Sequence, residues 1–288
     1  MTDYPVIDFR TRPPVPEFSD SFPLDPRRVE WMCSRIDSRV PDSYKEQSLE
    51  RWREEMRAAN VVKAIVIGNC LPPQIVPNDF LVELQERAPE VLGFAAIDPI
   101  GIAHDPVAET VRCIEELGLA GIYLEPGLSL RKSGAHRAGI YMDDIKMIPI
   151  YEACRDLDVP VIIVASPFAG NDLSYADPTR VDRIAEMFPT LPIICGHGCW
   201  PYAAEVIAVA YKRENVFVSP DFYSFMPGTG PFVDAMRHPA LSRQIIFATG
   251  YPLFRFDDLV EKHKALGLPE DCLRAVLHDN AARLLRLQ

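Results

Sequence analysis

Short runs of apolar residues alternate along the chain with segments in which apolar positions recur every three or four residues. Continuous apolar runs are typical of strands buried on both faces of a sheet, and the recurring pattern is typical of amphipathic helices. Eight runs are expected to be strands, namely Val6–Arg10, Val61–Gly68, Val91–Ile97, Gly121–Glu125, Val161–Ala165, Leu191–His197, Val216–Asp221 and Ile245–Thr249. Helical patterns cover Glu46–Asn60, Pro77–Arg87, Val107–Leu117, Asp143–Leu157, Pro178–Phe188, Ala203–Arg213 and about Glu270–Leu287.

This alternation predicts an α/β fold, a single (β/α)8 TIM barrel that forms one domain over residues 1–288. An open doubly wound sheet is disfavoured, because no Gly-x-Gly-x-x-Gly turn follows the first strand. Residues 11–45 are rich in Pro and Arg and interrupt the pattern. We expect them to form a long loop after the first strand that covers the barrel mouth.

Composition narrows the class of protein. The chain is 48% hydrophobic and 25% charged, which is a globular balance, and no apolar run approaches the roughly 18 residues of a membrane-spanning helix. A net charge of −11 argues against binding to nucleic acid or to an anionic membrane. Seven cysteines, an odd number, predict reduced thiols, and the N-terminal residues lack a secretory signal pattern. We therefore expect a cytoplasmic protein, as a homo-oligomer and most simply a dimer.

Ionisable residues gather at the carboxyl ends of the predicted strands, where the active sites of TIM barrels form. Arg10 and Arg12 end the first strand, and their spacing places them on one side of it. Glu125, His197 and Asp221 end the fourth, sixth and seventh. Guanidinium groups suit a carboxylate, and an imidazole is an acid or base near neutral pH. These residues are candidates for binding and converting a small anionic carboxylate.

The same residues also have structural interpretations. Arg10 and Arg12 are equally consistent with a buried ion-pair network with Glu125 and Asp221. His197 lies between two glycines and is a candidate acid or base, although a buried core histidine is the alternative. Aromatic candidates for a wall against a planar substrate are Tyr223, Tyr251 and Trp200. Ordinary core packing is the commoner explanation for such aromatic residues.

Six segments in order resemble one family. They are Ile7-Asp8, 118–126, 151–163, 188–198, 247–252 and 280–284. With them the chain resembles the amidohydrolase superfamily, in particular the amidohydrolase-related branch that includes aminocarboxymuconate-semialdehyde decarboxylase, aromatic-acid decarboxylases and lactonases. The resemblance implies a TIM barrel whose divalent metal is held by two histidines of the first strand, one of the fifth and an aspartate of the eighth.

The matching positions here hold Arg10, Arg12, Val164 and Gly250, and only the histidine of the sixth strand, His197, is kept. Two cations, an apolar side chain and a glycine supply no metal donors. The departure from the family pattern leads us to expect no cofactor and no metal. A rearranged divalent site made of Glu125, His197 and Asp221 is the minor alternative.

Three functions follow from the resemblance. The main expectation is a metal-independent, lactonase-like hydrolase that cleaves a C–O or C–N bond in a small cyclic or aromatic carboxylate. In it Arg10 and Arg12 bind the substrate, His197 activates water, and Asp221 or Glu125 orients His197. The nearest alternative is a decarboxylase of an aromatic or muconate-type acid. The other is a non-catalytic barrel that binds a small ligand.

Overall fold

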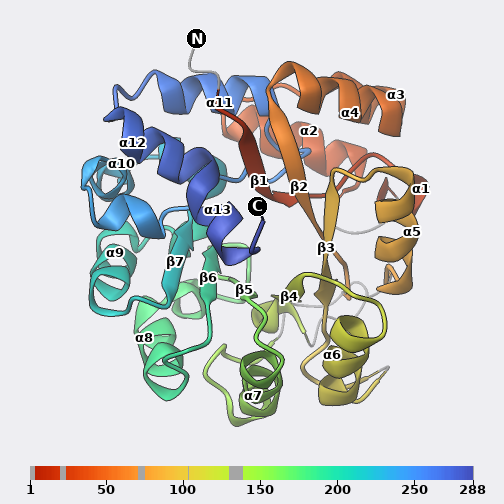
Figure 1. Ribbon diagram of the computed structural model, residues 1–288, viewed down its shortest axis with the longest axis vertical. Helices are drawn as coiled ribbons and strands as arrows, with labels where there is room; N and C mark the ends of the chain where they lie inside the picture. Colours follow the sequence, from red (N-terminus) through yellow and green to blue (C-terminus); the bar gives the residue numbers. More distant parts are fainter. Residues whose placement is uncertain (1–3, 20–23, 71–74, 103, 130–138, 288) are drawn as a thin grey trace.

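A computed structural model describes residues 4–19, 24–70, 75–102, 104–129 and 139–287. Seven parallel strands form one sheet in chain order, each hydrogen-bonded to the next, with helices arranged around it (Figure 1). The strands are β1 (Val6–Thr11), β2 (Val61–Ile67), β3 (Val91–Ala96), β4 (Gly121–Leu124), β5 (Val161–Val164), β6 (Ile193–Gly196) and β7 (Val216–Ser219). The predicted α/β TIM-barrel fold is therefore confirmed.

The predicted eighth strand, Ile245–Thr249, is not a regular strand, but it closes the ring. Ile246 N donates to Val218 O of β7 at 2.9 Å, and Phe9 N of β1 donates to Phe247 O at 3.0 Å. Parallel bridges also join Val218 to Ile245 and Thr11 to Tyr251. The segment thus lies between β7 and β1, where the eighth strand of a barrel belongs.

A buried carboxyl group links β1 to the segment that closes the barrel. Asp8 of β1 is fully buried and accepts hydrogen bonds from Thr249 N at 3.0 Å and from Thr249 Oγ1 at 2.5 Å. Burial raises the pKa of Asp8 to about 7, against the opposing effect of its hydrogen bonds with Thr249. Asp8 is therefore a carboxyl group that the fold shifts toward its neutral form.

Four of the described α-helices begin directly after a residue whose side chain caps the helix. Asp105 accepts from Ala108 N, and Asp177 accepts from Thr179 N, each just before a proline in the first turn. The longer helices are α2 (Pro26–Arg35), α4 (Leu49–Ala58), α5 (Asp79–Arg87), α6 (Pro106–Glu115), α7 (Ile148–Asp156), α8 (Pro178–Met187), α9 (Ala203–Lys212), α10 (Gly230–Arg237) and α11 (Phe256–Lys264). Shorter ones are α1 (Pro16–Ser19), α3 (Asp42–Glu46), α12 (Glu270–Arg274) and α13 (Asn280–Leu284).

Two apolar cores result from the alternation of side chains along the strands. One lies between the strands and the surrounding helices, and the other fills the barrel interior with residues such as Phe9, Phe94 and Phe217. Ala281 of α13 belongs to the interior core, and Leu285 packs against it. Helix α13 thus closes one end of the barrel, across the middle of the view in Figure 1.

The segment 11–45 differs from the expected loop. Its described part forms α1, α2 and the start of α3, while residues 20–23 lie outside the described residues. Asp25 caps α2 by accepting from Arg27 N and Arg28 N, and Pro26 occupies the first turn. The Pro and Arg content suggested a loop, but Pro16 and Pro26 stand at the starts of α1 and α2, where proline is tolerated.

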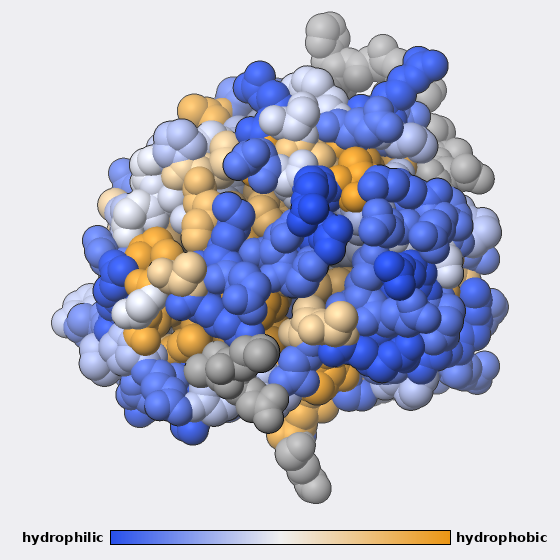
Figure 2. All heavy atoms as spheres, turned by 90° about the horizontal axis from the view of Figure 1, so that it is seen from above, coloured by the Kyte–Doolittle hydropathy of each residue, from blue (hydrophilic) through white to orange (hydrophobic). Residues whose placement is uncertain are grey.

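Hydrophilic residues cover most of the face seen in Figure 2, with apolar residues in smaller patches between them. Within the described ranges, no helix combines the length and apolar character needed to cross a membrane. The seven cysteines are free thiols, as the odd count predicts.

Candidate functional site

One cavity opens at the carboxyl ends of the strands, the end of the barrel opposite α13. It encloses about 790 Å³ of space, part of it continuous with solvent. Predicted site residues that line it are Arg10, Arg12, Glu125, His197, Tyr223 and Tyr251. The structure therefore brings together side chains from β1 and from the segments that follow β4, β6, β7 and the closing segment.

Two residues with left-handed backbone form the centre of the site. His197 directly follows β6 with φ of 65°, and Asp221 follows β7 with φ of 55°. His197 Nδ1 lies 2.9 Å from Asp221 Oδ2. A non-glycine residue held in this region is strained, and such strain is concentrated at functional sites because the surrounding structure must impose it. Asp221 lies behind His197 and is itself absent from the cavity wall.

Arg10 contacts both members of this pair. Its Nη1 lies 3.0 Å from Asp221 Oδ2 and 2.9 Å from His197 Nδ1, and it also contacts His197 Nε2. Burial lowers the pKa of Arg10, but Tyr123, Asp221 and Glu125 more than offset this, so the guanidinium stays charged. Arg10 and Asp221 therefore form a buried ion pair, as the structural interpretation of these residues expected.

Arg10 comes from an irregular strand end. The pairing of β1 with β2 shifts register between Asp8 and Thr11. Phe9 points into the barrel interior, yet the next residue, Arg10, lines the cavity. A bulge of this kind re-aims a side chain and is common at barrel rims.

The pKa values of the central pair follow from these contacts. Burial and the adjacent Arg10 guanidinium hold the pKa of His197 below its ordinary value, despite the opposing effect of Asp221. Burial raises the pKa of Asp221, but His197 and Arg10 outweigh it, so the net shift is downward. The pair is thus a carboxylate next to a neutral imidazole at pH 7, which suits a base rather than an acid.

Arg12 has a different environment. Its side chain is buried, with the residue 6% exposed, and it lines the cavity. Among the residues that the structure describes, the hydroxyl of Tyr123, at 3.4 Å, is the only hydrogen-bond acceptor of its guanidinium, and no carboxylate lies within ion-pair distance. A buried charge without an opposite charge is costly unless a ligand supplies one. Arg12 is therefore the group in the site best placed to receive an anion.

Tyr123 of β4 was not among the predicted site residues. Its hydroxyl donates to Glu125 Oε1 at 2.6 Å and accepts from Arg10 Nη2 at 3.0 Å. Both guanidinium carbons also lie over its ring, at 5.7 Å for Arg10 and 5.6 Å for Arg12. The signal was present in the sequence, because Tyr123 stands two positions before Glu125 and shares its side of the strand.

The predicted aromatic residues differ in position. Tyr223 lines the cavity and meets the His197 ring edge-on, with centroids 5.1 Å apart. Tyr251 also lines it, but its hydroxyl lies 2.6 Å from Ser43 Oγ and its ring stacks on Phe256. Trp200 stacks on Tyr223 at 5.3 Å and is not among the lining residues. Trp200 therefore supports the wall from behind.

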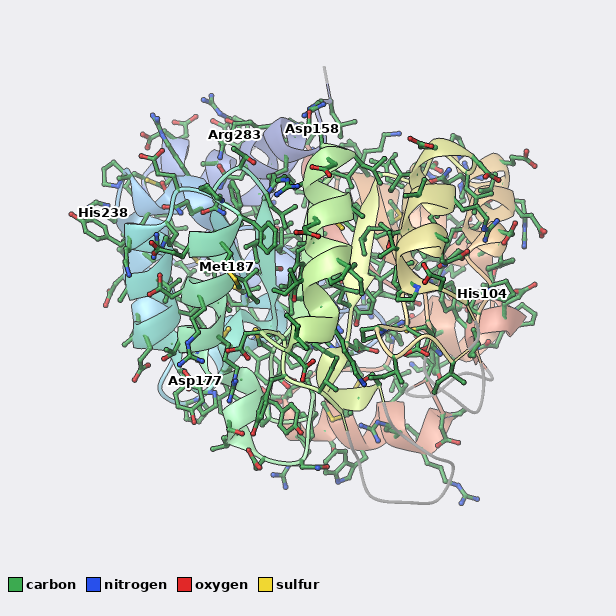
Figure 3. The ribbon with its side chains drawn as sticks, turned by 90° about the horizontal axis from the view of Figure 1, so that it is seen from below. His104, Asp158, Asp177, Met187, His238 and Arg283 are labelled. Atoms are coloured by element: carbon green, nitrogen blue, oxygen red, sulfur yellow. The ribbon has the colours of Figure 1, made fainter. Side chains whose placement is uncertain are left out.

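The region before α2 and the helix itself also contribute to the cavity wall, through Leu24, Arg28 and Met32. Ser166 and Phe168 contribute from the loop that follows β5. The segment 11–45 was expected over the mouth, but its sequence pattern does not distinguish the residues that face inward. Among the described residues, His104 and His238 are exposed and stand at opposite sides of the molecule in Figure 3.

The fold and site define a TIM barrel with a cavity at the carboxyl ends of its strands, lined by charged side chains and by a larger apolar surface. The chain belongs to the amidohydrolase family, which it matches over residues 7–287. A crystal structure of an uncharacterized TIM-barrel protein from Bordetella bronchiseptica is similar, with 29% identity, 98% of each chain covered and a TM-score of 0.88. No curated protein sequence matches the chain.

Two solved decarboxylases share the fold over nearly their whole length. 2,6-Dihydroxybenzoate decarboxylase complexed with 2,6-dihydroxybenzoate has 22% identity, a TM-score of 0.71, and coverage of 99% of this chain and 100% of that one. Dihydroxybenzoic acid decarboxylase from Polaromonas sp. JS666, with bound manganese and 2-nitroresorcinol, has 19% identity, a TM-score of 0.71, and coverage of 99% and 97%. At these sequence identities, the similarity establishes a shared fold.

These comparisons correct the expectation of a lactonase-like hydrolase. Solved structures that share the fold include decarboxylases of aromatic acids, which agrees with the alternative drawn from the sequence. The hydrolase expectation was wrong because the loss of metal ligands was taken as a sign of one particular metal-free reaction. The residues at the strand ends do not by themselves specify which bond is cleaved.

The expectation of no cofactor is also contradicted, since decarboxylases of this fold contain manganese. The residues of this chain nevertheless do not fit such an ion in the family's way. Arg10 Nη1 occupies the space beside both His197 and Asp221, and a fixed cation there repels a second one. In the described part of the chain, no three His, Cys, Asp or Glu side chains are grouped for a metal, Glu125, His197 and Asp221 included. No chemical step is therefore derived through a metal.

Proposed function

We propose that this protein is a decarboxylase that removes a carboxyl group from a small aromatic acid bound in the cavity. The observation that carries the proposal is the buried guanidinium of Arg12, which lines the cavity without a carboxylate partner in the described part of the chain. The decarboxylases that share the fold act on acids of this kind, and this supports the choice of reaction.

Arg12 is assigned to a group of the substrate that keeps its negative charge. A guanidinium paired with the departing carboxylate would oppose its loss as neutral CO2, because the ion pair would weaken on the way to the transition state. A phenolate or a second carboxylate keeps its charge and gains from the ion pair throughout. The departing carboxylate then lies against the apolar part of the wall, formed by Val164, Leu128 and Phe222. Loss of charge is favoured there, because the carboxylate is poorly solvated.

His197 is assigned to proton transfer. Asp221 accepts from Nδ1, so Nε2 carries the lone pair, and the substrate hydroxyl replaces the contact that Arg10 Nη1 makes with Nε2 in the free protein. In a substrate with a hydroxyl next to the carboxylate, Nε2 takes the hydroxyl proton and delivers it to the ring carbon that bears the carboxylate. The bond between that carbon and the carboxylate then breaks, its electron pair returns to the ring, and CO2 leaves. The phenolate that remains takes a proton from solvent, so the net reaction replaces a carboxylate by hydrogen.

The negative charge that develops on the ring oxygen is stabilised by the fixed cation of Arg10. Its guanidinium is already held by Asp221 and Tyr123, so little reorganisation is needed during the reaction. The pair Arg10 and Asp221 is in this view part of the site rather than only a structural ion pair.

The test is a turnover assay with a panel of hydroxybenzoic and benzenedicarboxylic acids, with and without added manganese. Release of CO2 and the decarboxylated product are measured by chromatography. We expect turnover of at least one acid and its loss in His197→Asn, while the exposed His238→Asn serves as the matched control and keeps wild-type activity. Tight binding of these acids with no CO2 release under either condition would reject the decarboxylase.

A further inference from the structure

Three charged side chains meet at one phenol oxygen. Tyr123 Oη donates to Glu125 Oε1 at 2.6 Å and accepts from Arg10 Nη2 at 3.0 Å and from Arg12 Nη2 at 3.4 Å. A tyrosine hydroxyl offers one donor and two acceptor positions, so all of its hydrogen-bonding capacity is used. The hydroxyl is fully committed to these three partners and has no capacity left for a ligand.

This arrangement keeps two opposite charges apart. Glu125 and Arg12 are 7% and 6% exposed, and both lie within 3.4 Å of the same oxygen. Yet among the described residues Arg12 has no ion pair. Two buried opposite charges this close attract each other strongly, and direct contact would satisfy both. The hydroxyl of Tyr123, which lies between them, is what they contact instead.

Direct contact would remove the anion-binding capacity of the cavity. With Glu125 on its guanidinium, Arg12 would present no net charge to a ligand, and binding would first require that ion pair to be broken. Arg10 would be a weaker anchor for the ligand's permanent anion, because its guanidinium already pairs with Asp221 at 3.0 Å, although its charge still stabilises an oxyanion that develops beside it.

We propose that Tyr123 is a positioning residue that keeps Glu125 from neutralising Arg12. Its hydroxyl satisfies the carboxylate of Glu125 and leaves the guanidinium of Arg12 charged for the anionic group of the ligand. The proposal rests on the proposed function only in assigning a ligand anion to Arg12. The placement of Glu125 relative to Arg12 can be tested without any ligand.

The experiment measures the affinity for 2,6-dihydroxybenzoate by calorimetry and the ligand-free crystal structure of each variant. In Tyr123→Phe we expect affinity to fall by about tenfold or more, with Glu125 and Arg12 moving into direct contact within 4 Å. In the double variant Tyr123→Phe/Glu125→Gln, affinity should return to within about threefold of wild type. A hydroxyl that merely stabilised the fold would not be rescued by neutralising Glu125. Tyr151→Phe, which removes a buried hydroxyl bonded to Met142 O outside the cavity, is the matched control.

A double variant that binds as weakly as Tyr123→Phe overturns the proposal, as does a Tyr123→Phe structure in which Glu125 and Arg12 remain apart. Glu125→Gln in the presence of Tyr123 gives an independent measurement that needs no change at Tyr123. Its affinity should be at least that of wild type, since a negative charge beside Arg12 is removed, and a tenfold loss would overturn the proposal because Glu125 itself would then be needed for binding. Wild-type protein that binds the acid without turnover would reject the decarboxylase but leave the role of Tyr123 intact.

Discussion

His197 Nδ1 lies 2.9 Å from Asp221 Oδ2, and the two residues follow consecutive strands, β6 and β7. The carboxylate fixes the orientation and the tautomer of the imidazole, which leaves Nε2 as the basic nitrogen. Both residues have left-handed backbone, so their relative position depends on two local conformations that the barrel imposes.

Replacing the carboxylate tests this relationship. In Asp221→Asn the imidazole loses the negatively charged acceptor that fixes its tautomer, and Arg10 loses its counter-charge, so we expect kcat to fall by about a hundredfold or more. Near-unchanged circular dichroism would show that the fold persists. The exposed Asp234→Asn, with the same chemical change on α10, is the control. Wild-type kcat in Asp221→Asn would remove Asp221 from the mechanism.

The pH dependence of kcat/KM should report His197. Burial and Arg10 hold its pKa below the ordinary value of 6.5, so the imidazole is neutral and basic at pH 7. Activity should fall only when the pH drops below 6.5, as the base becomes protonated. Arg10→Met removes a cation, so the acidic fall in kcat/KM should begin at a higher pH, and the maximum rate should be lower. An acidic fall at the same pH in Arg10→Met and wild type would contradict the assignment.

Arg12 should govern binding more than the rate of the chemical step. Arg12→Met keeps much of the side-chain volume but removes the charge, and we expect the Kd for an aromatic acid to rise by about tenfold to a hundredfold. Arg12→Lys should recover part of this loss, since it restores the charge without the planar fork. Calorimetry measures both. The exposed Arg35→Met, outside the cavity wall, is the matched control.

The raised pKa of Asp8 predicts that its contribution to the free energy of unfolding depends on pH. Its pKa in the folded protein is about 7, above the unfolded value of 3.8, so the folded state binds more protons between these values. The contribution of Asp8 to stability is therefore retained at pH 4 and is lost as the pH rises toward 7. Asp8→Asn can accept from Thr249 N and donate to Thr249 Oγ1 without this cost. We expect it to exceed wild type in free energy of unfolding by about 2 kcal/mol at pH 8 and by less at pH 5.

Urea unfolding at the two pH values measures this difference. Since other groups titrate as well, the comparison is between wild type and variant at each pH rather than between pH values for one protein. If the difference between Asp8→Asn and wild type is the same at pH 5 and pH 8, the carboxyl of Asp8 does not titrate in this range.

The meeting of Arg10, Glu125 and His197 at one rim was predictable. The carboxyl ends of parallel barrel strands share one edge, so chain position alone places such residues together. The sequence could not separate Arg10 from Arg12, because both are arginines at one strand end. The structure distinguishes the two arginines, because Asp221 Oδ2 lies 3.0 Å from Arg10 Nη1 and, among the described residues, forms no ion pair with Arg12.

Trp200 and the segment 11–45 show a second limit. Trp200 stands at a strand end, where residues face the cavity by rule, yet it packs on the outer side of Tyr223. Residues 26–35 form a helix whose start is visible in Asp25 and Pro26, but the surrounding prolines concealed it. In both cases side-chain packing between distant segments decides the outcome, and local sequence patterns do not record it.

The hydrogen bond between Phe9 and Phe247 has a consequence for biosynthesis. Because the partner of the first strand lies more than 200 residues later in the sequence, a nascent polypeptide emerging from the ribosome keeps both edges of its incomplete sheet unpaired until residues 245–249 have emerged. During that interval those edges can pair with other chains. Ribosomes stalled before position 245 should therefore display an aggregation-prone intermediate that recruits chaperones, and emergence of residues 245–249 should end that recruitment.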